Sequence, residues 1–204
     1  MKPLKTFIFA AVLASAVSPT AFAAESYKLD PTHTAITWHI SHFDFSRPSG
    51  KFMNVDGVIS LDQQAPEKSS VNVTIPVSEI NTGVAKLDEH LKSKDFFDVE
   101  AFPTAKFEST EVKMGENNTA KVTGNLTLHG VTKPVTLDVK LNKVAENMMK
   151  KQTAGFTATT TLKRSDFGIS AYLPGLGDDV TIDIESEANL MDAAPVAESD
   201  KKAN

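Results

Sequence analysis

Apolar and polar residues alternate along two adjoining stretches in the middle of the chain. Before His129 and Gly130 the apolar positions are Val122, Leu126 and Leu128, and after them Val135, Leu137, Val139 and Leu141. A period of two is typical of strands buried on one face, and glycine permits a tight reversal. The pattern predicts an antiparallel hairpin with one face covered and the other in water. Pro134, which lacks an N–H, is expected at the first residue of the second strand.

The same alternation recurs along the rest of the chain. It predicts further strands at about 36–40, 51–61, 71–77, 103–112, 156–162 and 180–188, the first beginning soon after Pro31. Between them, Val84, Leu87 and Leu91 recur at i, i+3 and i+7, which predicts a short amphipathic helix capped by Asn81 or Thr82. About eight strands, one short helix at one end and no repeat predict an all-β fold, a closed eight-stranded antiparallel barrel.

A barrel of eight strands leaves two possibilities for its interior. Side chains can fill it completely, or it can hold one small ligand. The residues that alternate toward the interior are the candidates in both cases.

Composition sets the boundaries of this domain. Residues 1–23 have a basic start, an apolar run from Phe7 to Val17 and a small-x-small site at Ala21-Phe22-Ala23, which predicts a cleaved signal peptide. We expect the barrel over 24–190 and a disordered acidic tail over 191–204.

The chain has no cysteine, so its core must suffice without disulfides. The net charge of −5 argues against nucleic acid or an anionic membrane surface as a partner, and no stretch is long enough for stable membrane insertion.

Motifs of catalysis are missing from the sequence. It has no G-x-S-x-G, no H-E-x-x-H and no phosphate-binding loop. The histidines near the first strand, His33, His39 and His42, are the candidate metal ligands. His33 and His39 share a strand face, whereas His42 lies on the other face, so a three-histidine site would require the chain to bend after Ile40. Structural histidines, or donors to a ligand head group, are the alternative.

Motifs along nearly all of the chain up to Leu190 resemble the YceI family of bacterial periplasmic proteins. They are Tyr27-Lys28-Leu29-Asp30 with His33, His42, Gly50-Lys51-Phe52, residues 87–98 (LDEHLKSKDFFD), Phe102-Pro103, Phe107, residues 124–135 (GNLTLHGVTKPV) and residues 166–169 (DFGI). The resemblance implies a lipocalin-like barrel in the periplasm that holds a long isoprenoid chain, such as a polyprenyl lipid or a quinone tail, without a cofactor and without catalysis.

These observations lead to one main hypothesis and two alternatives. The main hypothesis is a periplasmic carrier, monomer or homodimer, whose apolar tunnel binds an isoprenoid lipid. The alternatives are a metal- or haem-dependent protein, or an enzyme acting on an apolar substrate, that uses His33, His39 and His42, and a structural or stress-response protein with a packed barrel. The candidate lining residues are Ile36, Trp38, Ile40, Val73, Ile75, Phe107, Leu126, Leu128, Val135, Leu137, Phe156, Leu162, Ile182 and Ile184.

The tunnel is expected to open between two loops. These are residues 42–47 and 164–179, which carry aromatic and apolar residues in connections between strands. Arg164, Arg47 or His42 is predicted to lie near the polar head group of the ligand.

Overall fold

The computed structural model describes residues 24–192, so the expected signal peptide and the tail from residue 193 lie outside the described residues. The described residues form eleven strands, one α-helix and three 3₁₀ helices. The strands are β1 (Glu25–Leu29), β2 (Ala35–His42), β3 (Ser49–Phe52), β4 (Asp56–Leu61), β5 (Ser70–Pro76), β6 (Ile80–Asn81), β7 (Thr104–Met114), β8 (Thr119–Leu128), β9 (Val131–Glu146), β10 (Gln152–Lys163) and β11 (Leu176–Leu190); the helix is α1 (Ala85–Lys92), and the 3₁₀ helices are Pro66–Lys68, Val77–Glu79 and Arg164–Phe167.

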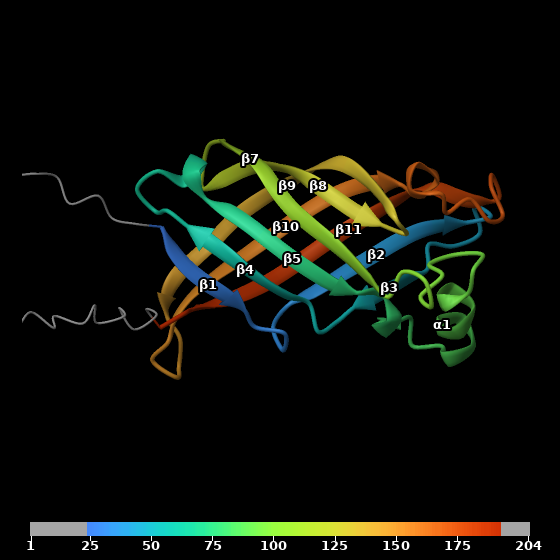
Figure 1. The fold of residues 1–204 in the computed structure, drawn as a ribbon, viewed down its shortest axis with the longest axis horizontal. Helices are drawn as coiled ribbons and strands as arrows, with labels where there is room; N and C mark the ends of the chain where they lie inside the picture. The colour runs from blue at the N-terminus through green and yellow to red at the C-terminus, as the bar shows by residue number, and fades with distance from the viewer. Residues whose placement is uncertain (1–23, 193–204) are drawn as a thin grey trace, which may run out of the picture.

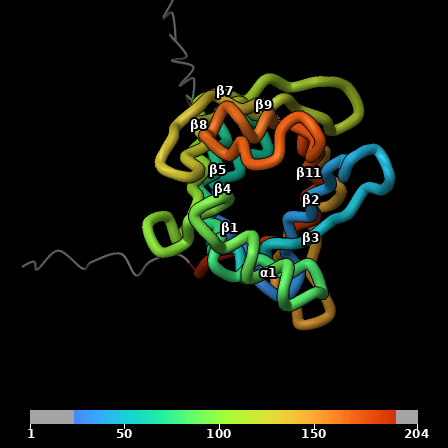
Figure 2. The backbone as a smooth tube through the Cα atoms, turned by 90° about the vertical axis from the view of Figure 1, so that its right-hand side faces the viewer, coloured from blue at the N-terminus to red at the C-terminus, as the bar shows by residue number. Residues whose placement is uncertain are grey.

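The strands form one antiparallel sheet that closes on itself. Around the ring the order is β1, β4, β5, β7, β8, β9, β10 and β11, and β11 pairs again with β1. The first part of β11 pairs with β2, and β3 and β6 continue from β2. This confirms the predicted closed eight-stranded antiparallel barrel. α1 lies at one end of the barrel, and both ends of the described chain lie at the other (Figure 1). The same barrel is seen from the α1 end in Figure 2.

The central hairpin is the one that the alternation predicts. β8 and β9 are joined by His129 and Gly130, both with positive φ (50° and 75°), and Leu128 pairs with Val131 across the turn. The position predicted for Pro134 was wrong, because β9 begins at Val131 and Pro134 is its fourth residue. Counting from the closing pair, Pro134 faces Asn125 at a non-hydrogen-bonded position, so its missing N–H removes no bond to β8. β10 pairs with β9 only from Asp138 onward.

The start of the barrel differs from the prediction in two places. The single strand expected over 51–61 was wrong, because it is divided into β3, which pairs with β2, and β4, which pairs with β1 and β5. The sequence pattern does not predict β1, because only Tyr27 and Leu29 mark its buried face. After β1 the chain turns at Asp30, whose carboxylate accepts hydrogen bonds from the backbone N–H (2.9 Å) and hydroxyl (2.6 Å) of Thr32. This turn lets two short strands, β1 and β2, pair with successive parts of the same long strand β11.

The predicted helix is present, but its cap is different. α1 begins after Val84, which is the N-cap residue and makes no side-chain hydrogen bond to the helix. Instead Asp88, inside the helix, accepts hydrogen bonds from the backbone N–H (2.7 Å) and hydroxyl (2.6 Å) of Thr82. These bonds lower the pKa of Asp88. The carboxylate therefore ties the helix to the segment that enters it.

At the end of the barrel opposite α1, buried side chains fill part of the interior. Tyr27, fully buried, points inward from β1 and packs in the core with Ala154 and Ala188, which are also fully buried. Two alanines there leave room for the large ring. Burial and the neighbouring Glu25 raise the pKa of Tyr27 to about 12.

Candidate ligand-binding cavity

A cavity of about 950 Å³ lies inside the barrel, and its walls are almost entirely apolar. At the α1 end it reaches His42, His90 and Tyr172, and at the other end it reaches Gln63 and Asn118. It therefore runs along the barrel rather than lying in one pocket of its wall. The volume is at the upper end of the range of about 300–1,000 Å³ that is typical of small-ligand pockets.

The inward positions of the strands supply the walls of this cavity. On β2, for example, Ile36, Trp38 and Ile40 are buried, while Thr37 and His39 between them are half-exposed. Each apolar residue that the sequence predicts as lining borders the cavity: Ile36, Trp38, Ile40, Val73, Ile75, Phe107, Leu126, Leu128, Val135, Leu137, Phe156, Leu162, Ile182 and Ile184. That these side chains contact a ligand stays a prediction.

Sequence reasoning missed other lining residues. Val71 and Val180 share a face with predicted neighbours, so the alternation already contained the signal for them. Leu91, Phe96 and Phe97 come from α1 and the turn after it, and no strand period could place them. Their position depends on how the helix folds over the barrel end.

An aromatic cluster lies where the cavity meets the α1 end. The rings of His90 and Phe96 pack edge to face with centroids 5.0 Å apart, and Tyr172 lies 6.2 Å from His90 and 6.1 Å from Phe96. Phe96 is buried, whereas Tyr172 is exposed and has a positive φ of 61°. The cluster joins α1 to the loop between β10 and β11.

The two loops that the sequence predicts as the mouth lie side by side. The backbone N–H of Phe43 donates to the carbonyl of Gly175 across them (2.8 Å). His42, at the end of β2, borders the cavity. Arg47 is exposed and is not among the residues that border it.

Arg164 borders the cavity but is buried, unlike an ordinary surface arginine. Its guanidinium donates to three backbone carbonyls, those of Ile169 (3.1 Å), Leu176 (2.9 Å) and Gly177 (2.7 Å). Burial lowers its pKa, and the nearby Asp178 partly opposes that effect. The contacts seen thus hold the loop between β10 and β11 in its fold, and a contact of Arg164 with a head group stays a prediction.

The three candidate metal ligands lie in separate places. His33 binds Asp30 through Nδ1 (2.9 Å) in the turn after β1, His39 faces Asp183 on the outside of the barrel (3.4 Å), and His42 is at the mouth. Residues 24–192 contain no group of three or more His, Cys, Asp or Glu that could hold a metal ion.

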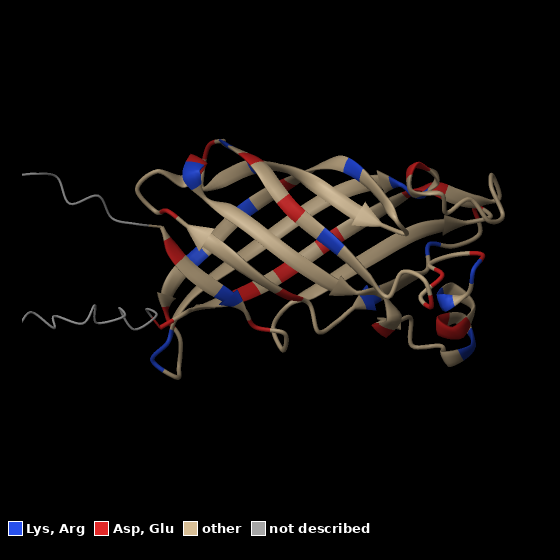
Figure 3. Cartoon of the chain, viewed as in Figure 1, with Lys and Arg blue, Asp and Glu red and all other residues tan. Residues whose placement is uncertain are grey.

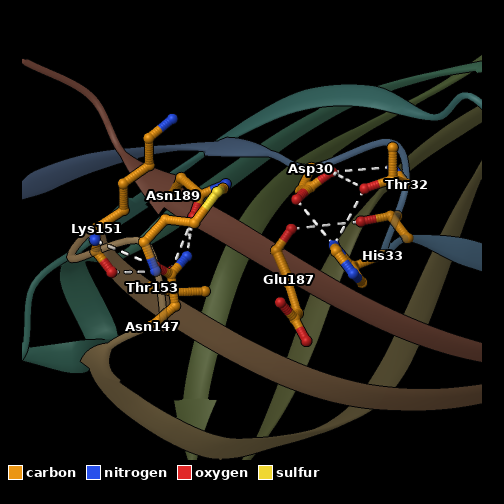
Figure 4. Close-up of polar contacts among 10 residues, drawn as sticks. Asp30, Thr32, His33, Asn147, Lys151, Thr153, Glu187 and Asn189 are labelled. Atoms are coloured by element: carbon orange, nitrogen blue, oxygen red, sulfur yellow. Dashed lines mark hydrogen bonds and ion pairs between the residues drawn. The ribbon is translucent and has the colours of Figure 1, made fainter.

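The turn around His33 has the residue types of a catalytic relay but a different geometry. Both the carboxylate of Asp30 and the hydroxyl of Thr32 lie at Nδ1 of His33, at 2.9 and 3.1 Å (Figure 4). A nucleophile–base–acid relay needs its two partners on opposite ring nitrogens. The hydrogen bonds among Asp30, Thr32 and His33 therefore stabilise the turn after β1.

Among the described residues, no helix has the length and apolar character needed to cross a membrane. The sequence model of one protein family, the YceI-like domain, matches residues 27–188. A UPF0312 protein of Pseudomonas putida is 41% identical over 167 residues, which cover 81% of this chain and 87% of that protein. One of Pseudomonas aeruginosa is 40% identical over 182 residues, 88% of this chain and 95% of the relative.

Solved structures share the fold. The Campylobacter jejuni YCEI protein has a TM-score of 0.68 at 29% identity, over 91% of this chain and all of that chain. Burkholderia cenocepacia BcnA has a TM-score of 0.72 at 22% identity, over 78% and 99%. A polyisoprenoid binding domain from Saccharophagus degradans has a TM-score of 0.61 at 15% identity, over 82% and 99%.

Proposed function

Because the chain belongs to the YceI family, we propose that it is a binding protein that holds a long isoprenoid lipid, a polyprenyl lipid or a quinone tail, in its barrel cavity. The observation that carries this proposal is the apolar cavity of about 950 Å³ along the barrel. The Saccharophagus structure, a polyisoprenoid binding domain, has a barrel of the same fold and supports the ligand class.

The physical argument is one of burial. Removing a hydrocarbon from water is worth about 0.8 kcal/mol per CH₂ group, so a long chain can be held by apolar walls alone. Such a site needs few polar groups. That agrees with a cavity in which the guanidinium of Arg164 already binds backbone carbonyls. We propose binding rather than catalysis, in the periplasm, with carriage of the lipid between sites as the role.

Trp38 offers a direct test, because it is the single tryptophan of the chain and borders the cavity. Its fluorescence should fall in a saturable, one-to-one manner when a quinone with a tail of several isoprene units is added. The same quinone ring without a tail should cause only weak, non-saturating quenching. Equal quenching by the two compounds would contradict a site for the isoprenoid chain.

A further inference from the structure

Four apolar side chains project into solvent beside the cavity, and together they are called the mouth rim. Phe43 and Phe45 lie between β2 and β3, and Tyr172 and Leu173 lie between β10 and β11. Their exposed fractions are 46%, 91%, 57% and 37%. Large apolar side chains gathered in this way on a protein surface mark an interaction site more often than scattered ones do.

The mouth rim is continuous with the cavity. Phe43 and Tyr172 both border the cavity and are exposed to solvent, and the hydrogen bond from Phe43 to Gly175 joins the two loops. Both loops lie at the α1 end, where the view along the barrel shows no backbone across its centre (Figure 2). The rim thus surrounds one side of the place where the cavity reaches solvent.

The rim carries few charges. Asp, Glu, Lys and Arg do not occur between Asp166 and Asp178, although 23% of the chain is charged. The other loop has Asp44, whose carboxylate accepts a hydrogen bond from Ser41 (2.9 Å), and Arg47. Charged residues lie along the strands of the barrel wall and on α1, which is at the same end of the barrel (Figure 3). Removing residues 167–177 from water therefore costs little in lost hydration of charges.

We propose that the mouth rim docks on the surface of a lipid bilayer, with Phe45 and Leu173 entering the interface and the cavity facing the membrane. The proposal rests on the proposed function in one respect, which is that an isoprenoid in the cavity comes from or goes to a membrane. Aromatic side chains favour the bilayer interface, where a ring is partly apolar and partly wet. Docking would let the hydrocarbon pass between bilayer and cavity without crossing water.

The position of the rim favours a bilayer over a second copy of the chain. A protein seated on Phe43 and Tyr172 would cover the place where the cavity meets solvent. A bilayer in the same position would instead contain the isoprenoid that enters or leaves the cavity. The near absence of charge on the loop between β10 and β11 also suits a zwitterionic surface, which offers no charged partner to pair with.

The opposite end of the barrel provides a matched control. Met148 and Met149, in the hairpin between β9 and β10, have exposed fractions of 102% and 71%. They are as apolar as the rim, but neither is among the residues that border the cavity. In Figure 1 this hairpin lies at the end away from α1.

The test is flotation of the full mature chain with phosphatidylcholine vesicles that contain no isoprenoid. The wild-type protein should float with the vesicles, and Phe45→Ser and Leu173→Ser should each weaken binding about tenfold, corresponding to roughly 1.4 kcal/mol. Met148→Ser should bind as the wild type does. The exposure of all three side chains makes a folding defect a poor explanation, and circular dichroism checks this.

Failure of docking and failure of the proposed function give different results. Quenching of Trp38 by the long-tailed quinone in detergent solution reports the cavity without a membrane. Saturable quenching with no flotation would overturn docking and leave the proposed function intact. Equal loss of binding in Phe45→Ser and Met148→Ser would overturn docking, and so would a wild-type dimer that Phe45→Ser converts to a monomer without any flotation.

Discussion

The indole ring of Trp38 on β2 lies directly over the α-carbon of Gly50 on β3, its partner across the sheet. A side-chain carbon at Gly50 would come within 2.7 Å of Cε2 of the ring. The indole Nε1 is buried and has no hydrogen-bond partner among the described residues. Gly50 therefore sets where the largest side chain of the cavity wall can lie.

Replacing Gly50 by alanine should displace the indole and destabilise the barrel by about 1–3 kcal/mol, the usual cost of an added group in a packed position. Urea unfolding gives the stability change, and the emission maximum of Trp38 reports the ring. Gly155→Ala is the control, because nothing lies within 4 Å of a carbon placed there. If both variants have the wild-type emission and stability, Gly50 does not position the ring.

The two arginines of the chain should differ sharply in their effect on stability. Arg164→Met removes donors to three backbone carbonyls and leaves those carbonyls without that partner. We expect a loss of about 2–4 kcal/mol, together with faster hydrogen exchange in the loop that follows. Arg47→Met, at an exposed position, should change stability by less than about 0.5 kcal/mol. Similar losses in the two variants would contradict the role assigned to Arg164.

The hydrogen-bonded pair of Asp30 and His33 should stabilise the turn only within a limited range of pH. Hydrogen bonds from Thr32 and His33 lower the pKa of Asp30 from 3.8 to about 2, and the bond to Asp30 raises the pKa of His33 above 6.5. The contribution of Asp30 is lost as the pH falls from about 4 toward 2. The contribution of His33 is complete below about pH 6.5 and is lost as the pH rises through its raised pKa.

NMR titration of His33 checks this coupling. Asp30→Asn should lower the pKa of His33 toward its ordinary value, because it removes the largest cause of the shift. Glu187→Gln should lower it less, since Glu187 acts only through its charge at a distance. An unchanged His33 pKa in Asp30→Asn would show that the pair does not form.

Much of the barrel follows from the sequence because alternation records which face of a strand is buried. The hairpin of β8 and β9 and the inward positions on β2 and β11 are of this kind. Features that depend on contacts between distant segments were not predictable. The carbonyls that bind the buried Arg164 come from the following loop and from the start of β11, up to thirteen residues later. A sequence pattern cannot show that an arginine will bind them.

Some residues of the candidate site were predictable from the sequence and others were not, for the same reason. Lining residues on strands are foreseeable because a side chain such as Val135 has only two faces to choose between. The packing at the α1 end is different, because the contact of Phe97 with Phe52 (5.7 Å between ring centroids) depends on the position of the helix over the barrel. The cap predicted at Asn81 or Thr82 failed for a related reason: Asp88 reaches back to bind Thr82.

Filling the cavity should separate binding from folding. Ala158 on β10 is buried and borders the cavity, so we expect a phenylalanine there to occupy part of the cavity. We expect Ala158→Phe to weaken binding of a long-tailed isoprenoid at least tenfold, with a stability change below about 1 kcal/mol. Thr159→Phe, on the exposed face of the same strand, should bind normally. Normal binding by Ala158→Phe, followed through Trp38 fluorescence, would place the ligand elsewhere.

The most direct test of the central claim is mass spectrometry of an organic-solvent extract of the protein purified from the cells that produce it naturally. The account predicts about one isoprenoid lipid or isoprenoid quinone per chain, and its mass would identify the ligand. The same extract from Ala158→Phe should be depleted of it, and that from Thr159→Phe should not. An empty extract, from wild-type protein that also fails to take up added polyprenyl lipid, would contradict the claim that the cavity is a binding site.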